Sequence, residues 1–423
     1  MNRIQIKLAF AYVLALFVVL FTSCNSDNMV THECFDSFSQ FRTQNEAIAI
    51  AESYASLLDS KLCTRSNQDL SVTRKADKNH TYSICNRGTR SNMNSITPLY
   101  YIVNYQDSLG FAIISANRNA ETVLALTECG YYAPETSSQI DGFNDFMNML
   151  NTYISSVSTT ELLPLMPISL ADTLWSIHYN LIDTQWQQTG VTGSFCPNGV
   201  TGCVPLAVAE ILSYYRHPTS IRLSYYGADL TTQNLDWVDI NKHVIESATC
   251  TATDSAHNAL GRLCRQLGEM MNSNYYDDGS TGTYRINVPV CFSALGYSVN
   301  NWTDYSSNCC VAPISNNHPL IIAGAAETPD GLAGHEWIVD GFIKRTIISR
   351  RYISYGTDTP TWESETEETV YNHINWGWGG MNNGYFFDGI FDTSNYSHLD
   401  STDSTISPSL NFDTNLQYLE VYR

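Results

Sequence analysis

Helical patterns come first and strand-like patterns follow in the C-terminal half of this chain of 423 residues. Apolar residues recur at helical intervals over 203–216, 256–271 and 288–295. Strand-like runs follow at 320–325, 336–348, 369–376, 385–388 and 416–422. Helices and strands that are segregated along a chain build an α+β domain, whereas strict alternation would give a parallel α/β sheet. The 26 tyrosines also favour a strand-rich protein over a helical bundle.

A smaller unit precedes this domain. Thr43-Gln44-Asn45-Glu46 has the spacing of a capping box and predicts a helix over 47–58. An amphipathic pattern predicts a second helix over 143–154. Three short apolar runs between the helices predict an antiparallel meander, at 99–105, 111–116 and 122–126. The polar segment 63–97 indicates a surface loop or a flexible stretch. The helix, meander and helix together predict a small α+β module.

The first residues form a targeting segment. Arg3 and Lys7 precede an apolar stretch over 8–21, which is too short for a comfortable membrane span. Small residues then precede Cys24, as at a bacterial lipoprotein cleavage site, and predict a lipid anchor on the Cys24 thiol. The alternative is an ordinary secretory signal in which this cysteine is incidental.

The predicted organisation has three parts. They are a signal peptide at 1–24, the module at 25–165 and the larger domain at 166–423. The junction is placed near the two prolines of 162–181, where the apolar runs are ambiguous.

Charge and cysteine spacing exclude several classes of function. The formal net charge of −20 leaves little to neutralise phosphates, so neither nucleic acid nor an anionic membrane surface is an expected partner. The 12 cysteines include no C-x-x-C pair, which argues against a zinc ribbon or a thioredoxin motif. We expect no metal and no cofactor, and membrane attachment only through the lipid anchor.

Cys203 stands directly before a helical pattern in Gly202-Cys203-Val204-Pro205. Unpaired N–H groups and the dipole at a helix start stabilise a thiolate and lower its pKa. The backbone N–H of Cys203 can also donate to an oxyanion. The alternative is a small buried cysteine, which is the commoner state of a free cysteine.

A histidine and an asparagine follow in the order that a thiol nucleophile needs. His335 begins a strand pattern, and its separation from the cysteine, 335 − 203 = 132 residues, lies within the papain-like range of roughly 130–150. Asn375 precedes Trp376-Gly377-Trp378-Gly379-Gly380, and its amide can orient the imidazole while a tryptophan shields the bond. A glycine-rich turn with core tryptophans is the alternative. Five rival histidines are more typical of surface or core positions: His178, His217, His257, His318 and His373.

These strings together resemble the streptopain family of bacterial cysteine peptidases. The resemblance rests on Gly202-Cys203-Val204, on Gly334-His335 with Trp337 and Asp340-Gly341, and on His373-x-Asn375-Trp376-Gly377-Trp378-Gly379-Gly380. The region 99–132 also resembles the propeptide of such enzymes. The resemblance implies a papain-like α+β peptidase domain preceded by an inhibitory propeptide, in other words a zymogen.

The resemblance also implies roles for single residues. Cys203 matches the nucleophile, His335 the general base, and Asn375 with Trp376 the region that orients the histidine. Gln188 in Trp186-Gln187-Gln188 matches an oxyanion donor, with Gln187 as the one-residue alternative. Residues expected at the substrate are Gly334, Ser280, Gly282 and Trp378. Glu336 replaces a small residue beside the base, and strand alternation predicts that it points away from His335 with little effect.

The function expected from the sequence is a cysteine endopeptidase made as a zymogen, which hydrolyses protein or peptide substrates through a thioester. Its own propeptide would be an intramolecular inhibitor. We expect it in the bacterial cell envelope, lipid-anchored on the periplasmic or outer face, or secreted after maturation. The alternatives are a catalytically silent surface lipoprotein that uses the same scaffold for binding, and a transpeptidase or amidase with the same Cys and His.

Overall fold

The structure is a computed structural model that describes residues 40–65, 73–85, 98–134, 141–157, 170–225, 231–246, 250–328, 331–353, 361–391 and 414–423. The predicted signal peptide with Cys24 and the predicted boundary between 165 and 166 lie outside these residues. No helix among the described residues is long and apolar enough to cross a membrane.

The N-terminal module (residues 40–157) contains the predicted helix, meander and helix. Its elements are α2 (Gln44–Arg65), β1 (Ala76–Cys85), β2 (Pro98–Tyr105), η1 (Gln106–Ser108), β3 (Phe111–Ser115), β4 (Val123–Thr127) and α3 (Asp141–Ser156). The capping box forms as predicted, because Thr43 N donates to Glu46 Oε2 at 2.7 Å and Glu46 N donates to Thr43 Oγ1 at 3.3 Å.

The surface loop predicted over 63–97 is wrong in part, because the structure forms strand β1 within this segment. It pairs antiparallel with β2, with Tyr82 opposite Ile102. Most of its side chains are exposed or half-buried, so its sequence carries no apolar alternation. An edge strand of this kind is held by backbone hydrogen bonds to its neighbour, and these leave no mark on the side-chain pattern.

The larger domain has its helices first and its main strands afterwards, as predicted. The helices are α4 (Cys203–Tyr215), α5 (Trp237–Ile240), α6 (Asp254–Met270), α7 (Val288–Ala294) and α8 (Val311–Ser315). The long strands are β5 (Leu170–His178), β12 (Leu320–Thr328), β13 (Gly331–Ile353), β14 (Thr361–Asn375), β15 (Gly384–Phe387) and β16 (Thr414–Tyr422). The short elements are β6 (Ser220–Leu223), β7 (Thr231–Asn234), β8 (Asn274–Tyr275), β9 (Thr281–Gly282), β10 (Ser298–Val299), β11 (Thr303–Asp304), η3 (Arg285–Asn287) and η4 (Asp388–Ile390).

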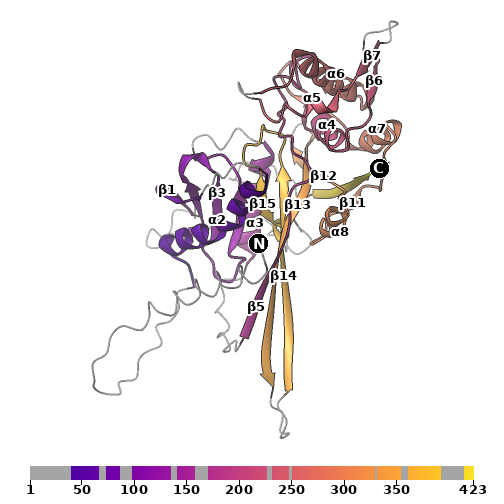
Figure 1. Ribbon diagram of the computed structural model, residues 1–423. Helices are drawn as coiled ribbons and strands as arrows, with labels where there is room; N and C mark the ends of the chain where they lie inside the picture. Colours follow the sequence, from indigo (N-terminus) through magenta and orange to yellow (C-terminus); the bar gives the residue numbers. More distant parts are fainter. Residues whose placement is uncertain are drawn as a thin grey trace, which may run out of the picture. The chain divides into compact units, whose positions relative to one another are not determined.

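One sheet runs through the module and the larger domain. Its main path has the order β1-β2-β3-β4-β15-β14-β13-β12-β16-β10. The two parts join where β4 pairs antiparallel with β15, with Ala125 opposite Phe386. Strand β5 lies alongside the β13–β14 hairpin, as Figure 1 shows. Segregated helices on a largely antiparallel sheet confirm the predicted α+β class.

Aromatic packing also joins the module to the larger domain. Phe146 of α3 is fully buried, with its ring 4.7 Å from that of Phe386 and 6.5 Å from that of Trp376, centroid to centroid. The Trp376 ring in turn lies 5.4 Å from that of Trp337 on β13. The module therefore packs against the side of the sheet that carries the Asn-Trp-Gly-Trp string.

Helix α4 lies inside an apolar core of the larger domain. Its residues from Val204 to Ser213 are all buried, and it packs against α6 and β13. A helix that is apolar on nearly every side belongs in the interior of a domain. Burial of residues 204–213 holds the preceding Cys203 in place at the sheet.

Candidate active site

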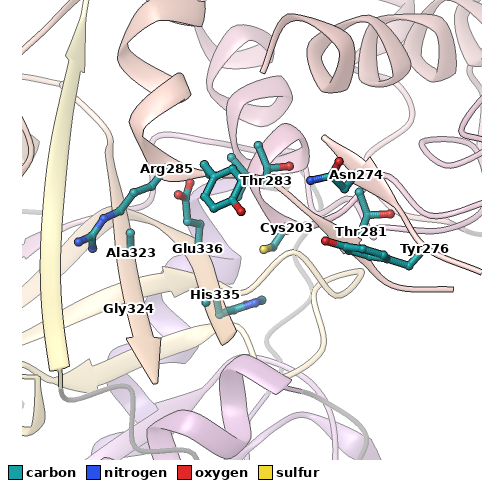
Figure 2. Close-up of a pocket in the computed structure, with 14 residues that line it drawn as sticks. Cys203, Asn274, Tyr276, Thr281, Thr283, Arg285, Ala323, Gly324, His335 and Glu336 are labelled. Atoms are coloured by element: carbon teal, nitrogen blue, oxygen red, sulfur yellow. The ribbon is translucent and has the colours of Figure 1, made fainter. Parts of the chain in front are cut away.

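Cys203 and His335 line one pocket of about 300 Å³. Figure 2 shows them with Glu336 near the middle of the lining, and with Tyr276 and Thr281 nearby. The remaining lining residues are Val204, Asn274, Gly282, Thr283, Tyr284, Arg285, Ala323, Gly324 and Gly334. The two predicted reactive side chains therefore meet at one cavity, although they come from a helix and a distant strand.

The start of α4 is built around Gly202. This residue has a φ of 88°, and a Cβ atom there would lie 3.0 Å from Thr281 Cγ2. Only glycine adopts this conformation readily and allows the loop to approach so closely. This close contact places the start of α4 against β9. Cys203 therefore faces the side of the pocket that is formed by strands and loops.

The Cys203 thiol is held in its neutral form. Burial and the neighbouring Glu336 carboxyl raise its pKa to about 12, against the backbone N–H groups of Glu336, Val204 and Cys203, which lower it. The sequence predicted a lowered pKa from the helix start alone. That prediction is wrong for this structure, because desolvation outweighs the N–H groups.

His335 is also neutral. It is 5% exposed, and burial lowers its pKa to about 4, while a hydrogen bond to the Trp376 backbone raises it. Its ring lies nearly parallel to that of Trp337, 6.0 Å away between centroids. Its Nε2 is buried without a hydrogen-bond partner. One face of the ring is therefore supported, and one nitrogen is unused.

The Cys203 thiol and the His335 ring do not form an ion pair in this structure. The hydrogen bonds among the described residues include none between the Cys203 thiol and the His335 ring, and neither group contributes to the other's pKa. The reason is electrostatic, since both groups are desolvated and each lacks the opposite charge that would stabilise its ionised form.

The hydrogen bonds of the Asn375 side chain go to residues other than His335. Its Nδ2 donates to Glu210 Oε2 at 2.8 Å and to the Thr184 carbonyl at 3.2 Å. Its Oδ1 accepts from the Gly377 N–H and from Asn383 Nδ2, both at 3.1 Å. The neighbouring Trp376 backbone holds the imidazole instead. Asn375 thus anchors the turn that positions Trp376, which is a different role from the one expected.

Glu336 differs from its prediction in its consequence. It is 4% exposed, lines the pocket, and raises the pKa of the Cys203 thiol rather than that of His335. Burial raises its own pKa to about 8, although the nearby Arg285 lowers it. Its Oε2 is buried without a hydrogen-bond partner. A carboxyl in this state is largely protonated at neutral pH and faces the reactive sulfur.

The other predicted residues are divided between the pocket and its surroundings. Gly334 and Gly282 line the pocket, whereas Ser280 and Trp378 lie outside its lining. Gln188 also lies outside the lining, but its carbonyl accepts from the Thr201 N–H at 2.8 Å, two residues before Cys203. The alternative Gln187 forms a β-bridge with Trp378 and packs against Gly379.

Glu210 is a central residue that was not predicted from the sequence. Its two carboxyl oxygens accept from the Trp186 N–H at 2.7 Å and from Asn375 Nδ2 at 2.8 Å. Burial raises its pKa to about 8 against these two donors. Glu210 therefore joins α4 to the chain at Trp186 and at Asn375. A lone acidic residue in the apolar run 204–213 was the signal that could have identified it.

Comparison with known proteins identifies the family of this chain. The sequence profile described as the Peptidase C10 family matches residues 177–386, and the Spi protease inhibitor profile matches residues 39–154. Streptopain from Streptococcus pyogenes is 21% identical over 330 residues, which cover 68% of this chain and 73% of that protein.

Two further relatives extend the comparison. A thiol protease/hemagglutinin, PrtT of Porphyromonas gingivalis, is 22% identical over 330 residues, or 68% of this chain and 34% of its own. The solved structure of a prointerpain A fragment from Prevotella intermedia is 18% identical, with a TM-score of 0.48, and covers 81% of this chain and 98% of its own. On the two profile matches and the streptopain relatives, the chain belongs to the Peptidase C10 family of papain-like cysteine peptidases and carries an N-terminal propeptide domain of the Spi inhibitor type.

Proposed function

We propose that this protein is a cysteine endopeptidase made as a zymogen, which hydrolyses peptide bonds through a thioester. The observation that supports this most directly is that Cys203, at a helix start, and His335, on a strand, line the same pocket. A latent thiol peptidase requires a cysteine and a histidine that are both neutral and lie at one cavity, and this chain of the family has both.

In the proposed reaction, His335 first takes the proton of the Cys203 thiol. The thiolate attacks the carbonyl carbon of the scissile bond, and the carbonyl electrons move to the oxygen, which the Cys203 N–H and Gln188 stabilise. His335 then protonates the leaving amine, and the C–N bond breaks to leave a thioester. His335 next takes a proton from a water molecule, whose oxygen attacks the carbonyl carbon of the thioester. The C–S bond then breaks, the acid leaves, and the proton on His335 returns to the Cys203 sulfur. Gly334 and Gly282 would contact the substrate backbone.

Latency follows from the contacts of the N-terminal module. Among the residues that the structure describes, those lining the pocket all belong to the larger domain, so no described part of the module fills the pocket. It packs instead through Phe146 against Trp376, whose backbone holds the His335 ring. We infer that the module maintains His335 in an unpaired position, and that cleavage of the module lets His335 approach Cys203.

Attachment to the envelope is also part of this proposal. The sequence around Cys24 supports a lipid anchor, followed by release or surface display of the mature enzyme in the bacterial envelope. Intact-mass measurement before and after incubation would report the anchor and the maturation point together. A mature N-terminus near the predicted junction in 162–181, with a diacylated Cys24 on the released fragment, is the expected result.

Two other functions use the same residues. A silent binding protein would leave Cys203 unreactive, so a peptide inhibitor with a thiol-directed group distinguishes it from an enzyme. We expect the matured chain to be labelled at Cys203 and to lose hydrolysis in proportion to the label. A transpeptidase would join the acyl fragment to an added amine, whereas the proposed endopeptidase releases mainly the free acid. Absence of labelling and hydrolysis in the shortened chain would support the binding protein.

Glu336 is expected to make stability depend on pH. Its folded pKa of about 8 lies above the usual value of a glutamate, so the folded chain binds a proton that the unfolded chain has already lost. The corresponding stability is present below about pH 4 and is lost as pH rises towards 8. Relative to Glu336→Gln, the parent should therefore lose on the order of a few kcal/mol of unfolding free energy between pH 5 and 8.

Urea unfolding at several pH values measures this difference. Both chains should carry Cys203→Ala so that they stay intact. Glu365→Gln, at an exposed position of β14, is the matched control and should leave the pH dependence unchanged. Parallel stability curves for the parent and Glu336→Gln would show that Glu336 is ionised in the folded chain.

A further inference from the structure

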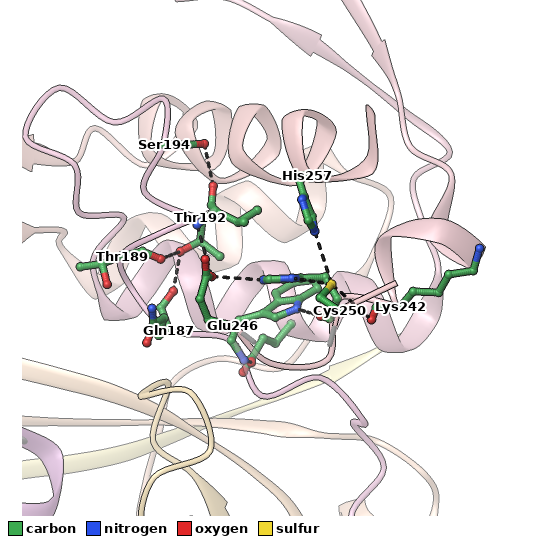
Figure 3. Close-up of polar contacts among 12 residues, drawn as sticks. Gln187, Thr189, Thr192, Ser194, Lys242, Glu246, Cys250 and His257 are labelled. Atoms are coloured by element: carbon green, nitrogen blue, oxygen red, sulfur yellow. Dashed lines mark hydrogen bonds and ion pairs between the residues drawn. The ribbon is translucent and has the colours of Figure 1, made fainter. Parts of the chain in front are cut away.

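A second group of reactive side chains lies outside the pocket. His243, Cys250 and His257 each offer one ligand atom, and the three atoms lie within 4.8 Å of one another. Figure 3 shows His257 and Cys250 pointing toward one another, with Glu246 beside them. We propose that His243, Cys250 and His257 form a zinc-binding site, which is independent of the peptidase function.

The distances fit a single metal ion. Tetrahedral zinc with a bond of about 2.3 Å to sulfur and about 2.0 Å to nitrogen places the two ligand atoms about 3.5 Å apart. Cys250 Sγ lies 3.3 Å from His243 Nδ1 and 3.5 Å from His257 Nε2. A thiol has one proton and can donate it to only one of these rings. A metal ion would satisfy both imidazoles and the sulfur together.

A carboxylate completes the arrangement behind one ligand. Glu246 Oε2 lies 3.4 Å from His243 Nε2, the ring nitrogen that does not face the sulfur. A carboxylate that accepts this N–H leaves the lone pair on Nδ1 for the metal and fixes the ring plane. Glu246 is itself positioned, because Val191 N donates to it at 3.4 Å and its carboxyl packs against Gly190.

The three ligands stand on supported backbone. The His243 N–H donates to the Ile240 carbonyl at the end of α5, and the His243 carbonyl accepts from the Trp186 indole. His257 lies in the first turn of α6, which Thr253 caps. His243 is 3% exposed, whereas Cys250 and His257 are half-buried, so an ion can arrive from solvent and keep a water as its fourth ligand.

The ligand types select the metal. One thiolate and two imidazoles favour zinc over magnesium or calcium, which prefer oxygen ligands. A bound ion would tie the connection between α5 and α6 to the segment 185–192, through His243 and Glu246. That segment carries Gln188, so the metal would stabilise one wall beside the pocket without touching the reactive residues.

The test is zinc binding by the full chain in a Cys203→Ala background, kept reduced and freed of metal. Cys203→Ala keeps the chain intact and removes the pocket thiol as a competing ligand. Titration against a chromogenic chelator should show one tight equivalent of Zn²⁺ per chain. Cys250→Ser and His257→Ala should each bind at least about a hundredfold more weakly, and Glu246→Gln about tenfold to a hundredfold.

Matched controls and a second readout keep the outcome clear. Cys85→Ser and His318→Ala alter residues of the same types elsewhere and should bind as the parent does. Cobalt should give a thiolate-to-metal absorption band in the parent that Cys250→Ser lacks. Thermal unfolding shows whether each variant folds, and His257→Ala alone suffices should Cys250→Ser not fold. No tight equivalent in the parent, or equal binding by His257→Ala, would overturn the site.

Discussion

Replacement of Cys203 by alanine is expected to abolish peptide hydrolysis. The substitution removes the only atom that forms the proposed thioester, and loss of a nucleophile typically lowers turnover by about a millionfold. The fold should survive, because the thiol faces the pocket while α4 is held by its apolar sides. Hydrolysis of a fluorogenic peptide by the incubated chain measures the loss.

The same variant tests maturation. Wild type should shorten on incubation by losing its N-terminal module, whereas Cys203→Ala should stay at full length. Cys85→Ala, which alters a half-buried cysteine on β1, is the control and should mature normally. Full activity in Cys203→Ala, or its conversion to the short form in the absence of any other protease, would refute the role of Cys203.

A second large effect is expected in the reactivity of Cys203 before and after maturation. With a pKa of about 12, about one thiol in 100,000 is ionised at pH 7 in the intact chain. Pairing with His335 would give a stable thiolate of low pKa, as in papain-like enzymes. A thiolate of low pKa is also a weaker nucleophile, so the gain in rate is smaller than the gain in ionised thiol. Alkylation of Cys203 should be about 10- to 100-fold faster in the mature chain than in the intact chain at pH 7, and on the order of a thousandfold faster at pH 5.

The pH profile distinguishes the two states more sharply than a single rate. In the intact chain, alkylation of Cys203 should rise about tenfold per pH unit up to at least pH 10. In the mature chain it should be nearly constant between pH 5 and 8. Brief iodoacetamide treatment of a maturing sample, separation of the two forms by size, and peptide mapping measure both. The buried Cys264 is the internal control, and identical profiles for Cys203 would contradict latency.

Most regular elements were predictable because their signals are local. Helix α6 was expected over 256–271 and runs over Asp254–Met270, and α7 was expected over 288–295 and runs over Val288–Ala294. Both bury one apolar face, which repeats every 3.6 residues in the sequence. Strand β1 could not be predicted from apolar periodicity. Most of its side chains are exposed or half-buried, and its pairing with β2 depends on backbone groups.

The contacts that the site depends on were less predictable. Strand alternation predicted that Glu336 points away from His335, but it gave no sign that the Glu336 carboxyl would neighbour the Cys203 thiol. The amide of Asn375 was expected at the imidazole, yet it donates to Glu210, a residue 165 positions away in the sequence. The proposed zinc ligands were not predicted, because six residues separate each ligand from the next and this spacing matches no short metal-binding pattern.

The sequence alone predicted the α+β class and the helix that begins at Cys203, and its resemblance to a peptidase family implied that Cys203 and His335 meet at one cavity. These features depend on apolar periodicity and on a few rare side chains in a specific order, and both can be read from the amino-acid sequence. The protonation of Cys203, His335 and Glu336, and the use of the Trp376 backbone to hold the imidazole, depended on the folded structure. Ionisation follows from the loss of water and the charges that the fold brings near, and neither quantity exists until distant segments have packed together.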